Sequence, residues 1–322
     1  MKGGKEYMGQ SKNTLETAVD LLVQNSLPHK NTIIIGDNAA GKSKVIKCYV
    51  KHRLEQKQMI YYMDAVNRYF SVSSISASPK KLVFSNLITE TRIKDENFNL
   101  EDTWSYYGTP TERIEMIYNL YENEVQEMFC DFTGINFRIF LKESQDVEFK
   151  NGIIGKLSSG YQALLRMFLE MIYIRHTLEK EADIVVVIDE ADEFLSPKNS
   201  RKLYDFLIKR FPDLSFIFST HSVDFIAGAA KANILILKDT DIEVLDADDY
   251  QDVSDVAAIF KEVFGNDQEK GNAERTDEKL RLLINNRIAS VWGENEEKML
   301  NEIEESELSA AQKLIYHQIK EW

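Results

Sequence analysis

Residues 36–43 form a glycine-bounded run that ends in a lysine and a hydroxyl residue, in the pattern G-x-x-x-x-G-K-S. Glycines let a backbone approach phosphate oxygens, and successive amide groups at a helix N-terminus form an anion nest. A lysine adds a point charge there, and a serine hydroxyl is a ligand that Mg²⁺ accepts. The sequence therefore predicts a phosphate and Mg²⁺ site built from Gly36, Asp37, Asn38, Ala39, Ala40, Gly41, Lys42 and Ser43.

A second chemical signal follows the apolar run Ile184–Ile188, where Asp189 and Glu190 are consecutive. A buried strand delivers its carboxyl end to the edge at which open α/β sheets bind ligands. We expect Asp189 to hold Mg²⁺ through its water shell and Glu190 to polarise an attacking water as general base. The structural alternative is a strand that merely ends in two acids, and the phosphate loop upstream disfavours it.

Two further signals are weaker when each is taken alone. Ser158, Ser159 and Gly160 begin a long helix, where they could face an anion or could simply form a helix N-cap. His221 follows Ser219 and Thr220 at the end of an apolar run. A lone histidine is more often structural than catalytic, but this position at a strand end favours a place in the site.

Short apolar runs separated by helical segments predict the framework that positions these residues. Such runs, bounded by helical patterns, are typical of parallel strands buried on both faces, so we expect an α/β fold with a mostly parallel sheet flanked by helices. An inserted helical lobe is expected at about 79–134, followed by an antiparallel pair at 136–141 and 147–149. The expected parallel strands are 32–35, 59–64, 184–188, 214–218 and 234–237, and the expected helices beside them are 15–27, 42–56 and 161–179.

The composition changes near the end of the chain. Residues 1–265 are expected to form the core, 266–277 hold almost no apolar side chain and read as a linker or exposed loop, and 278–322 read as a small C-terminal helical appendage.

Charge and cysteine content exclude several classes of protein. The 39 Lys and Arg against 53 Asp and Glu give a net charge of −14 over 322 residues, which argues against a general nucleic-acid binder but leaves a local basic patch open. The only two cysteines, Cys48 and Cys130, argue against a disulfide framework and favour a reducing cytoplasm. The longest apolar run is about five residues against the roughly 20 of a membrane-spanning helix, so no membrane partner is expected.

The order of the motifs, a phosphate loop, a serine-glycine turn, a strand ending in Asp-Glu and a strand ending in Ser-Thr-His, resembles that of ATP-binding-cassette (ABC) ATPases. The resemblance spans roughly residues 14–260 and is closer to soluble SMC-like and OLD-like members than to transporter subunits. It implies a P-loop NTPase fold of ABC-ATPase type that binds ATP and Mg²⁺. By this resemblance, residues 36–43 match the Walker A loop, Leu157–Gln162 the signature motif, Asp189 and Glu190 the Walker B pair, and His221 the switch histidine.

The resemblance also implies a head-to-tail dimer that forms around ATP. Ser158 and Gly160 of one copy would act on the ATP held by the other. Between them, Ser159 stands where the family usually has glycine. Tyr161 replaces an acidic or amide residue, and Ser196 stands where the soluble relatives carry a histidine before proline. Asn67 is the candidate for the glutamine that normally links Mg²⁺ to the helical lobe.

Three functions fit the resemblance. The first is an ATP-hydrolysing switch that controls a separate effector protein, encoded by a neighbouring gene, in antiviral defence. The alternative is a compact DNA-repair or recombination ATPase, although the roughly 115 residues between Ser43 and Ser158 carry no sustained heptads. The third is the nucleotide-binding subunit of a transporter, which would need a membrane partner.

Overall fold

The computed structural model describes most of the chain in segments. The described residues are 6–24, 26–37, 40–98, 113–139, 147–149, 154–155, 157–178, 183–238, 241–250, 252–264, 276, 279–280, 282–284, 286–287, 291–303, 308 and 310–321.

The central element is a six-stranded sheet in the order β2-β6-β7-β1-β8-β9. Its strands are β1 (Asn31–Gly36), β2 (Met59–Met63), β6 (Ile184–Ile188), β7 (Ser215–Ser219), β8 (Ala232–Leu237) and β9 (Ile242–Asp246). The first five strands in this order are parallel, and β9 pairs antiparallel to β8. The expected mostly parallel α/β fold is confirmed, and so are all five expected parallel strands.

Strand β9 was not expected from the sequence. Its residues are only half-buried or exposed, and its run Ile-Glu-Val-Leu-Asp lies within a stretch of acidic residues. An edge strand with one solvated face carries polar residues among apolar ones, so the continuous apolar run that marks the inner strands is missing here.

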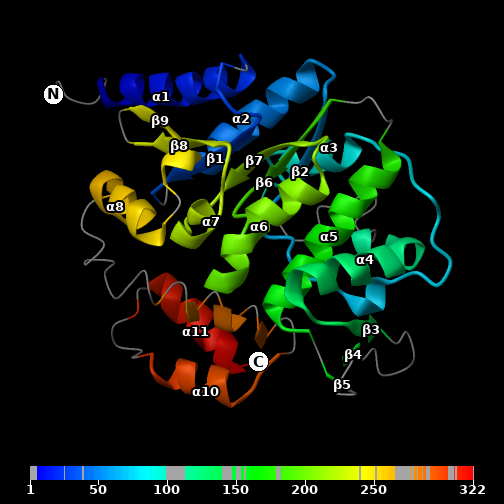
Figure 1. The fold of residues 1–322 in the computed structure, drawn as a ribbon. Coiled ribbons are helices and arrows are strands. Elements are labelled where there is room, and N and C mark those ends of the chain that lie inside the picture. Colours follow the sequence, from blue (N-terminus) through cyan, green and yellow to red (C-terminus); the bar gives the residue numbers. More distant parts are fainter. Residues whose placement is uncertain are drawn as a thin grey trace.

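Side-chain alternation along the strands separates two apolar layers, as expected for a sheet covered on both faces. Ile34 and Val187 pack in one layer with α1 (Glu6–Val23) and α2 (Lys42–Glu55). Ile33 and Val186 pack in the other with α5 (Ser159–Thr177), α6 (Pro197–Arg210) and α7 (Val223–Ala227). Figure 1 shows α1 and α2 on one side of the sheet and α5 and α6 on the other.

The segment expected to form a helical lobe, about 79–134, is mainly helical where it is described and packs against α5. After η1 (Val72–Ser74), its described elements are α3 (Leu87–Ile93), η2 (Ile114–Ile117) and α4 (Tyr118–Thr133), and residues 99–112 lie outside the described residues. Phe132 of α4 meets Phe168 of α5 edge to face, with ring centroids 5.7 Å apart. The antiparallel pair is confirmed as β3 (Phe137–Ile139) with β4 (Val147–Phe149), and a short β5 (Ile154–Gly155) extends it.

The last part of the chain is helical where it is described. After η3 (Ala247–Asp249) and α8 (Val253–Phe264) come α10 (Glu294–Asn301) and α11 (Ala310–Glu321), which agree with two expected helices. Of the expected linker 266–277, only Thr276 lies within the described residues, and the helix expected at 278–288 is described only in part. Leu280, Leu283, Leu300 and Ile319 belong to an apolar cluster of their own.

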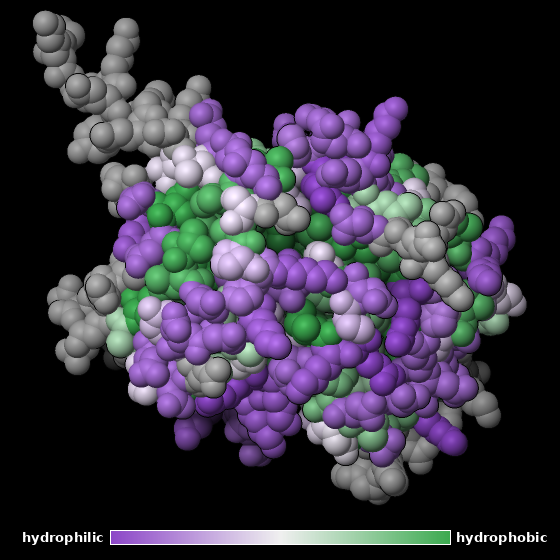
Figure 2. Space-filling model, turned by 45° about the horizontal axis from the view of Figure 1, so that its top comes forward, coloured by the Kyte–Doolittle hydropathy of each residue, from purple (hydrophilic) through white to green (hydrophobic). Residues whose placement is uncertain are grey.

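Hydrophilic side chains cover much of the face drawn in Figure 2, with apolar patches between them. The large apolar side chains that are exposed in the described part of the chain are scattered over five elements or loops: Val66, Val83, Leu87, Leu120 and Val244. Across the described residues, every helix is too short or too polar to cross a bilayer.

Candidate active site

The loop expected to cradle phosphate joins β1 to α2, and its backbone favours glycine at both ends. Gly41 caps α2 with a φ of +97°, in the left-handed region that favours glycine. A Cβ on Gly36 would lie 3.0 Å from the carbonyl oxygen of Leu237 on the neighbouring strand. The Ala40 amide donates to the carbonyl of Asp37 over 3.0 Å, which tightens the turn. Asn38 and Ala39 lie outside the described residues.

Lys42 is buried at the start of α2 and points back into this loop. Its Nζ donates to the carbonyl oxygen of Gly36 over 2.9 Å and to that of Asp37 over 3.3 Å. Burial lowers the pKa of Lys42, while the charges of Glu190, Asp189 and Asp37 raise it. The ammonium therefore lies within electrostatic reach of both carboxylates that follow β6, as the sequence predicts.

Asp189 is completely buried at the carboxyl end of β6, and hydroxyl groups surround its carboxylate. The hydroxyls of Ser219 and Ser43 hydrogen-bond to it, and the Tyr62 hydroxyl donates to Oδ2 over 3.3 Å. Burial raises the pKa of Asp189, and the charge of Glu190 adds to this, while the bonds from Ser219 and Ser43 oppose it. A serine hydroxyl beside a carboxylate is the oxygen donor set that Mg²⁺ prefers, so Ser43 and Asp189 fit such an ion.

Glu190 and His221 lie together beside this pair. The Glu190 Oε1 and the His221 Nε2 are 3.3 Å apart, and both side chains are partly exposed. Glu190 has a φ of +50°, which is uncommon for a residue with a side chain. The carboxyl ends of β1, β6 and β7 therefore bring together Lys42, Ser43, Asp189, Glu190 and His221 from three distant parts of the sequence.

The serine-glycine turn has local structural partners. Ser158 is the exposed N-cap of α5, and its hydroxyl oxygen accepts from the Tyr161 amide over 3.4 Å. Ser159 is the first residue of that helix. A Cβ on Gly160 would lie 2.6 Å from the carbonyl oxygen of Phe194, in the turn after β6. Capping and close packing thus account for these residue types within one chain, and their action on a second copy stays a prediction.

Three residues that sequence reasoning did not assign to the site touch Asp189. Ser219 had a weak signal, because it is a hydroxyl residue at the end of an apolar strand. Tyr62 reads as a core aromatic, and Arg68, whose guanidinium donates to the Asp189 carbonyl over 2.6 Å, carries no sequence signal. The amide nitrogen of Asn67 lies 2.8 Å from both carboxylate oxygens of Asp64, so Asn67 takes part in a buried turn.

A buried set of charges joins the site's edge of the sheet to the helical lobe. Arg92 of α3 holds Glu170 of α5 through two bonds of 2.8 and 3.0 Å, and its Nε lies 3.4 Å from Asp64. Arg166 lies 3.2 Å from Glu170 and 3.5 Å from Glu115. Burial raises the pKa of Glu170, but Arg92 and Arg166 outweigh this and hold it at about 2. Glu170 is therefore ionised at neutral pH, between the guanidinium groups of Arg92 and Arg166.

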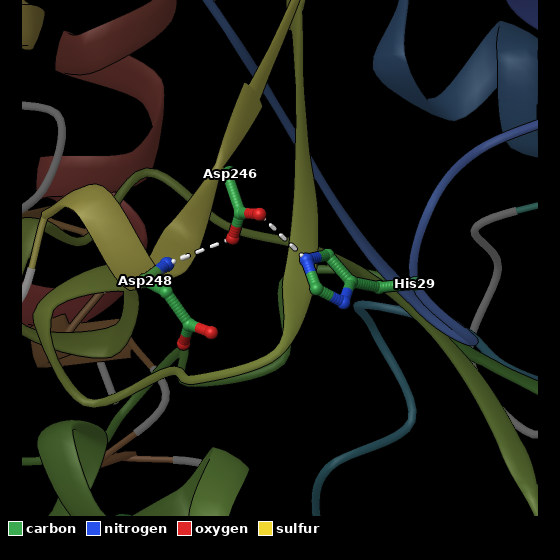
Figure 3. Close-up of side chains that lie close together, drawn as sticks. All are labelled: His29, Asp246 and Asp248. Atoms are coloured by element: carbon green, nitrogen blue, oxygen red, sulfur yellow. Dashed lines mark hydrogen bonds and ion pairs between the residues drawn. The ribbon is translucent and has the colours of Figure 1, made fainter.

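A second group of ligand-type side chains, His29, Asp246 and Asp248, lies at the other end of the strands, where β1 begins and β9 ends (Figure 3). His29 Nε2 and Asp246 Oδ2 are 2.8 Å apart, and the Asp248 amide donates to the other oxygen of Asp246 over 3.0 Å. The Asp248 carboxylate accepts from the Lys231 amide over 2.8 Å. These bonds fasten the end of β9 to the start of β1, which is a structural role.

Comparisons with known proteins give partial likenesses. No protein-family model matches the chain, and no curated protein does. Among solved structures, an SMC head domain from Thermotoga maritima is 17% identical over 67% of this chain and 90% of that one, with a TM-score of 0.36. An ATP-binding cassette of an ABC transporter is 14% identical over 74% of this chain and 89% of that one, with a TM-score of 0.41.

A third likeness is to an SMC head bound to the C-winged helix domain of ScpA. It is 16% identical and covers 68% of this chain and 91% of that one, with a TM-score of 0.37. At these identities and scores, we base the functional proposal on the residues of this chain.

Proposed function

We propose that this chain is an ATPase of the ABC type that binds Mg–ATP and hydrolyses it to ADP and phosphate. The observation that carries the proposal is the meeting of Lys42, Ser43, Asp189, Glu190 and His221 at the carboxyl ends of three parallel strands. Ligands bind at this edge in open α/β sheets. A buried ammonium, a hydroxyl-carboxylate pair and a partly exposed carboxylate are the groups that phosphoryl transfer to water requires.

Each group has one task in this proposal. Backbone amides of residues 36–43 and the Lys42 ammonium bind the β- and γ-phosphates, and Ser43 and Asp189 hold Mg²⁺, which neutralises charge on the phosphate oxygens when bound. Glu190 takes the proton of the attacking water, whose oxygen bonds to the γ-phosphorus as the bond to the bridging oxygen breaks. His221, 3.3 Å from Glu190, orients that carboxylate and faces the γ-phosphate.

The proposal includes a dimer that closes around ATP. Ser158 is exposed at the N-terminus of the 19-residue helix α5, and its hydroxyl, whose oxygen accepts from the Tyr161 amide, still has its O–H to donate to a phosphate of a second copy. Resemblance to soluble defence ATPases supports a further step, in which dimer closure controls an effector protein. Mass analysis of proteins that copurify with the chain, with and without ATP, tests that step.

Hydrolysis by a Glu190→Gln variant tests the proposed chemistry. Glutamine keeps the size of the side chain but cannot accept the proton, so phosphate release should fall at least about 100-fold while Mg–ATP binding is kept. Glu90→Gln is the matched control, because Glu90 is exposed on α3, away from the site, and should release phosphate at the wild-type rate. Wild-type turnover by Glu190→Gln would contradict the role of Glu190.

A further inference from the structure

We propose that Ser219 is a positioning residue that holds Glu190 in its water-activating conformation. This inference rests on the proposed ATPase function, because it assigns the group that fixes the general base. Ser219 ends β7, which lies between β6 and β1 in the sheet, and its side chain is completely buried. Ser219 therefore lies next to β6, which Asp189 follows, and next to β1, which leads into the phosphate loop.

Ser219 contacts three consecutive residues at the point where the chain leaves β6. Its hydroxyl donates to the Asp189 carboxylate, and the same oxygen accepts from the Glu190 amide over 2.8 Å. Its carbonyl oxygen accepts from the Ala191 amide over 2.9 Å. One serine thus fixes the Mg²⁺-binding carboxylate, the backbone of the general base and the residue after it.

These bonds hold Glu190 in a backbone conformation that a residue with a side chain seldom adopts. A φ of +50° is strained for a residue with a side chain, and such a residue persists only when its surroundings determine it. The Ser219 hydroxyl is positioned to do this, because it meets the Glu190 amide directly. Without the hydroxyl, Glu190 can relax and carry its carboxylate away from the attacking water.

The contacts also predict which kinetic constant should change. After loss of the Ser219 hydroxyl, Asp189 keeps the Tyr62 and Ser43 hydroxyls, and Lys42 keeps its bonds to the loop carbonyls. Binding of Mg–ATP should therefore persist, whereas activation of water depends on the geometry of Glu190. Displacement of a catalytic group by about 1 Å can cost on the order of 100-fold in rate.

The test is steady-state ATP hydrolysis by Ser219→Ala, with Ser215→Ala as matched control on the same strand. We expect kcat of Ser219→Ala to fall about 10- to 100-fold while KM for ATP stays within about threefold. Ser215→Ala, at the far end of β7, should keep both constants. Ser219→Cys leaves no cavity and brings a larger but weaker hydrogen-bonding group, so it should also lower kcat and serves where Ser219→Ala is unstable.

The Glu190→Gln background separates this inference from the proposed function. If Ser219 acts through Glu190, adding Ser219→Ala to Glu190→Gln causes no further loss of rate, because the two changes remove one effect. A full additive loss would overturn the inference, and so would a wild-type kcat in both Ser219 variants. Wild-type turnover by Glu190→Gln would instead contradict the proposed function itself.

Discussion

Glu190 and Lys42 show how the residues of the site are charged and held. Glu190 is partly exposed and contacts His221, whereas Lys42 is buried with its ammonium turned onto the carbonyl oxygens of the loop. Burial lowers the pKa of Lys42, and the nearby carboxylates counteract this. A triphosphate in the loop would accept the hydrogen bonds that the carbonyl oxygens of Gly36 and Asp37 accept from the ammonium here.

Lys42→Ala tests this role at the residue scale. Loss of a charge-assisted hydrogen bond to phosphate removes about 1.5–3 kcal/mol, so the Kd for Mg–ATP should rise about 10- to 150-fold. Equilibrium binding of a fluorescent ATP analogue measures the change. Lys44→Ala is the matched control, because Lys44 is exposed two residues further along α2. Equal affinity of the two variants would remove Lys42 from the site.

The sequence predicted the site residues that belong to motifs, but it did not predict the residues that only the tertiary fold brings to Asp189. The residues of the phosphate loop, Asp189–Glu190 and His221 follow apolar strands. Their types and spacing therefore predict that they meet at the carboxyl ends of the parallel strands. Ser219 and Arg68 reach Asp189 across strands or loops far apart in the sequence. Only the order and register of the strands, Ser219 beside Ile34 and Phe218 beside Ile188, bring them there.

At the scale of elements, the buried charges attach the helical lobe to the sheet. Arg92 of α3 also donates to the carbonyl of Tyr62 in β2 over 2.7 Å, while Glu170 lies in the middle of α5. Sequence alone did not predict this cluster, because its charged residues lie in separate segments and no motif pairs them. Their pairing depends on the tertiary contact of α3, α5 and η2.

Glu170→Gln should destabilise the fold. Removing one partner of a buried ion pair costs about 3–5 kcal/mol, because Arg92 and Arg166 lose their charged partner. Urea unfolding at pH 7 measures this loss. Glu124→Gln is the control, because Glu124 pairs with the exposed Arg175, and its loss should cost less than about 1 kcal/mol. Equal losses in the two variants would contradict a stabilising role of the buried pair.

The same pair predicts a pH dependence. The folded-state pKa of Glu170 is about 2, below its ordinary value of 4.5, so its stabilising contribution is present above pH 4.5 and is lost as the pH falls toward 2. The difference in unfolding free energy between wild type and Glu170→Gln should shrink over this interval. A difference that stays constant between pH 6 and pH 3 would contradict the assignment.

At the scale of the whole molecule, the proposed site lies at the carboxyl ends of the parallel strands, and the surface that would meet a second copy lies at the start of α5. The exposed Ser158 lies at the start of α5. Glu170 in the same helix pairs with Arg92 of α3, and Arg92 also bonds to the carbonyl of Tyr62 in β2. Closure of a dimer on ATP would therefore act on a helix that buried ion pairs connect to α3 and, through Arg92, to β2. The C-terminal helices have an apolar cluster of their own, and their folding as a separate appendage at 278–322 stays a prediction.

The mass of the Glu190→Gln protein with and without Mg–ATP, measured by light scattering, tests the central claim most directly. We expect a monomer without nucleotide and a dimer with Mg–ATP, because the variant holds ATP without hydrolysing it. Adding Ser158→Arg should keep ATP binding but prevent the dimer, since a long charged side chain would replace the small cap. A dimer that forms regardless of ATP, or that survives Ser158→Arg unchanged, would contradict the account.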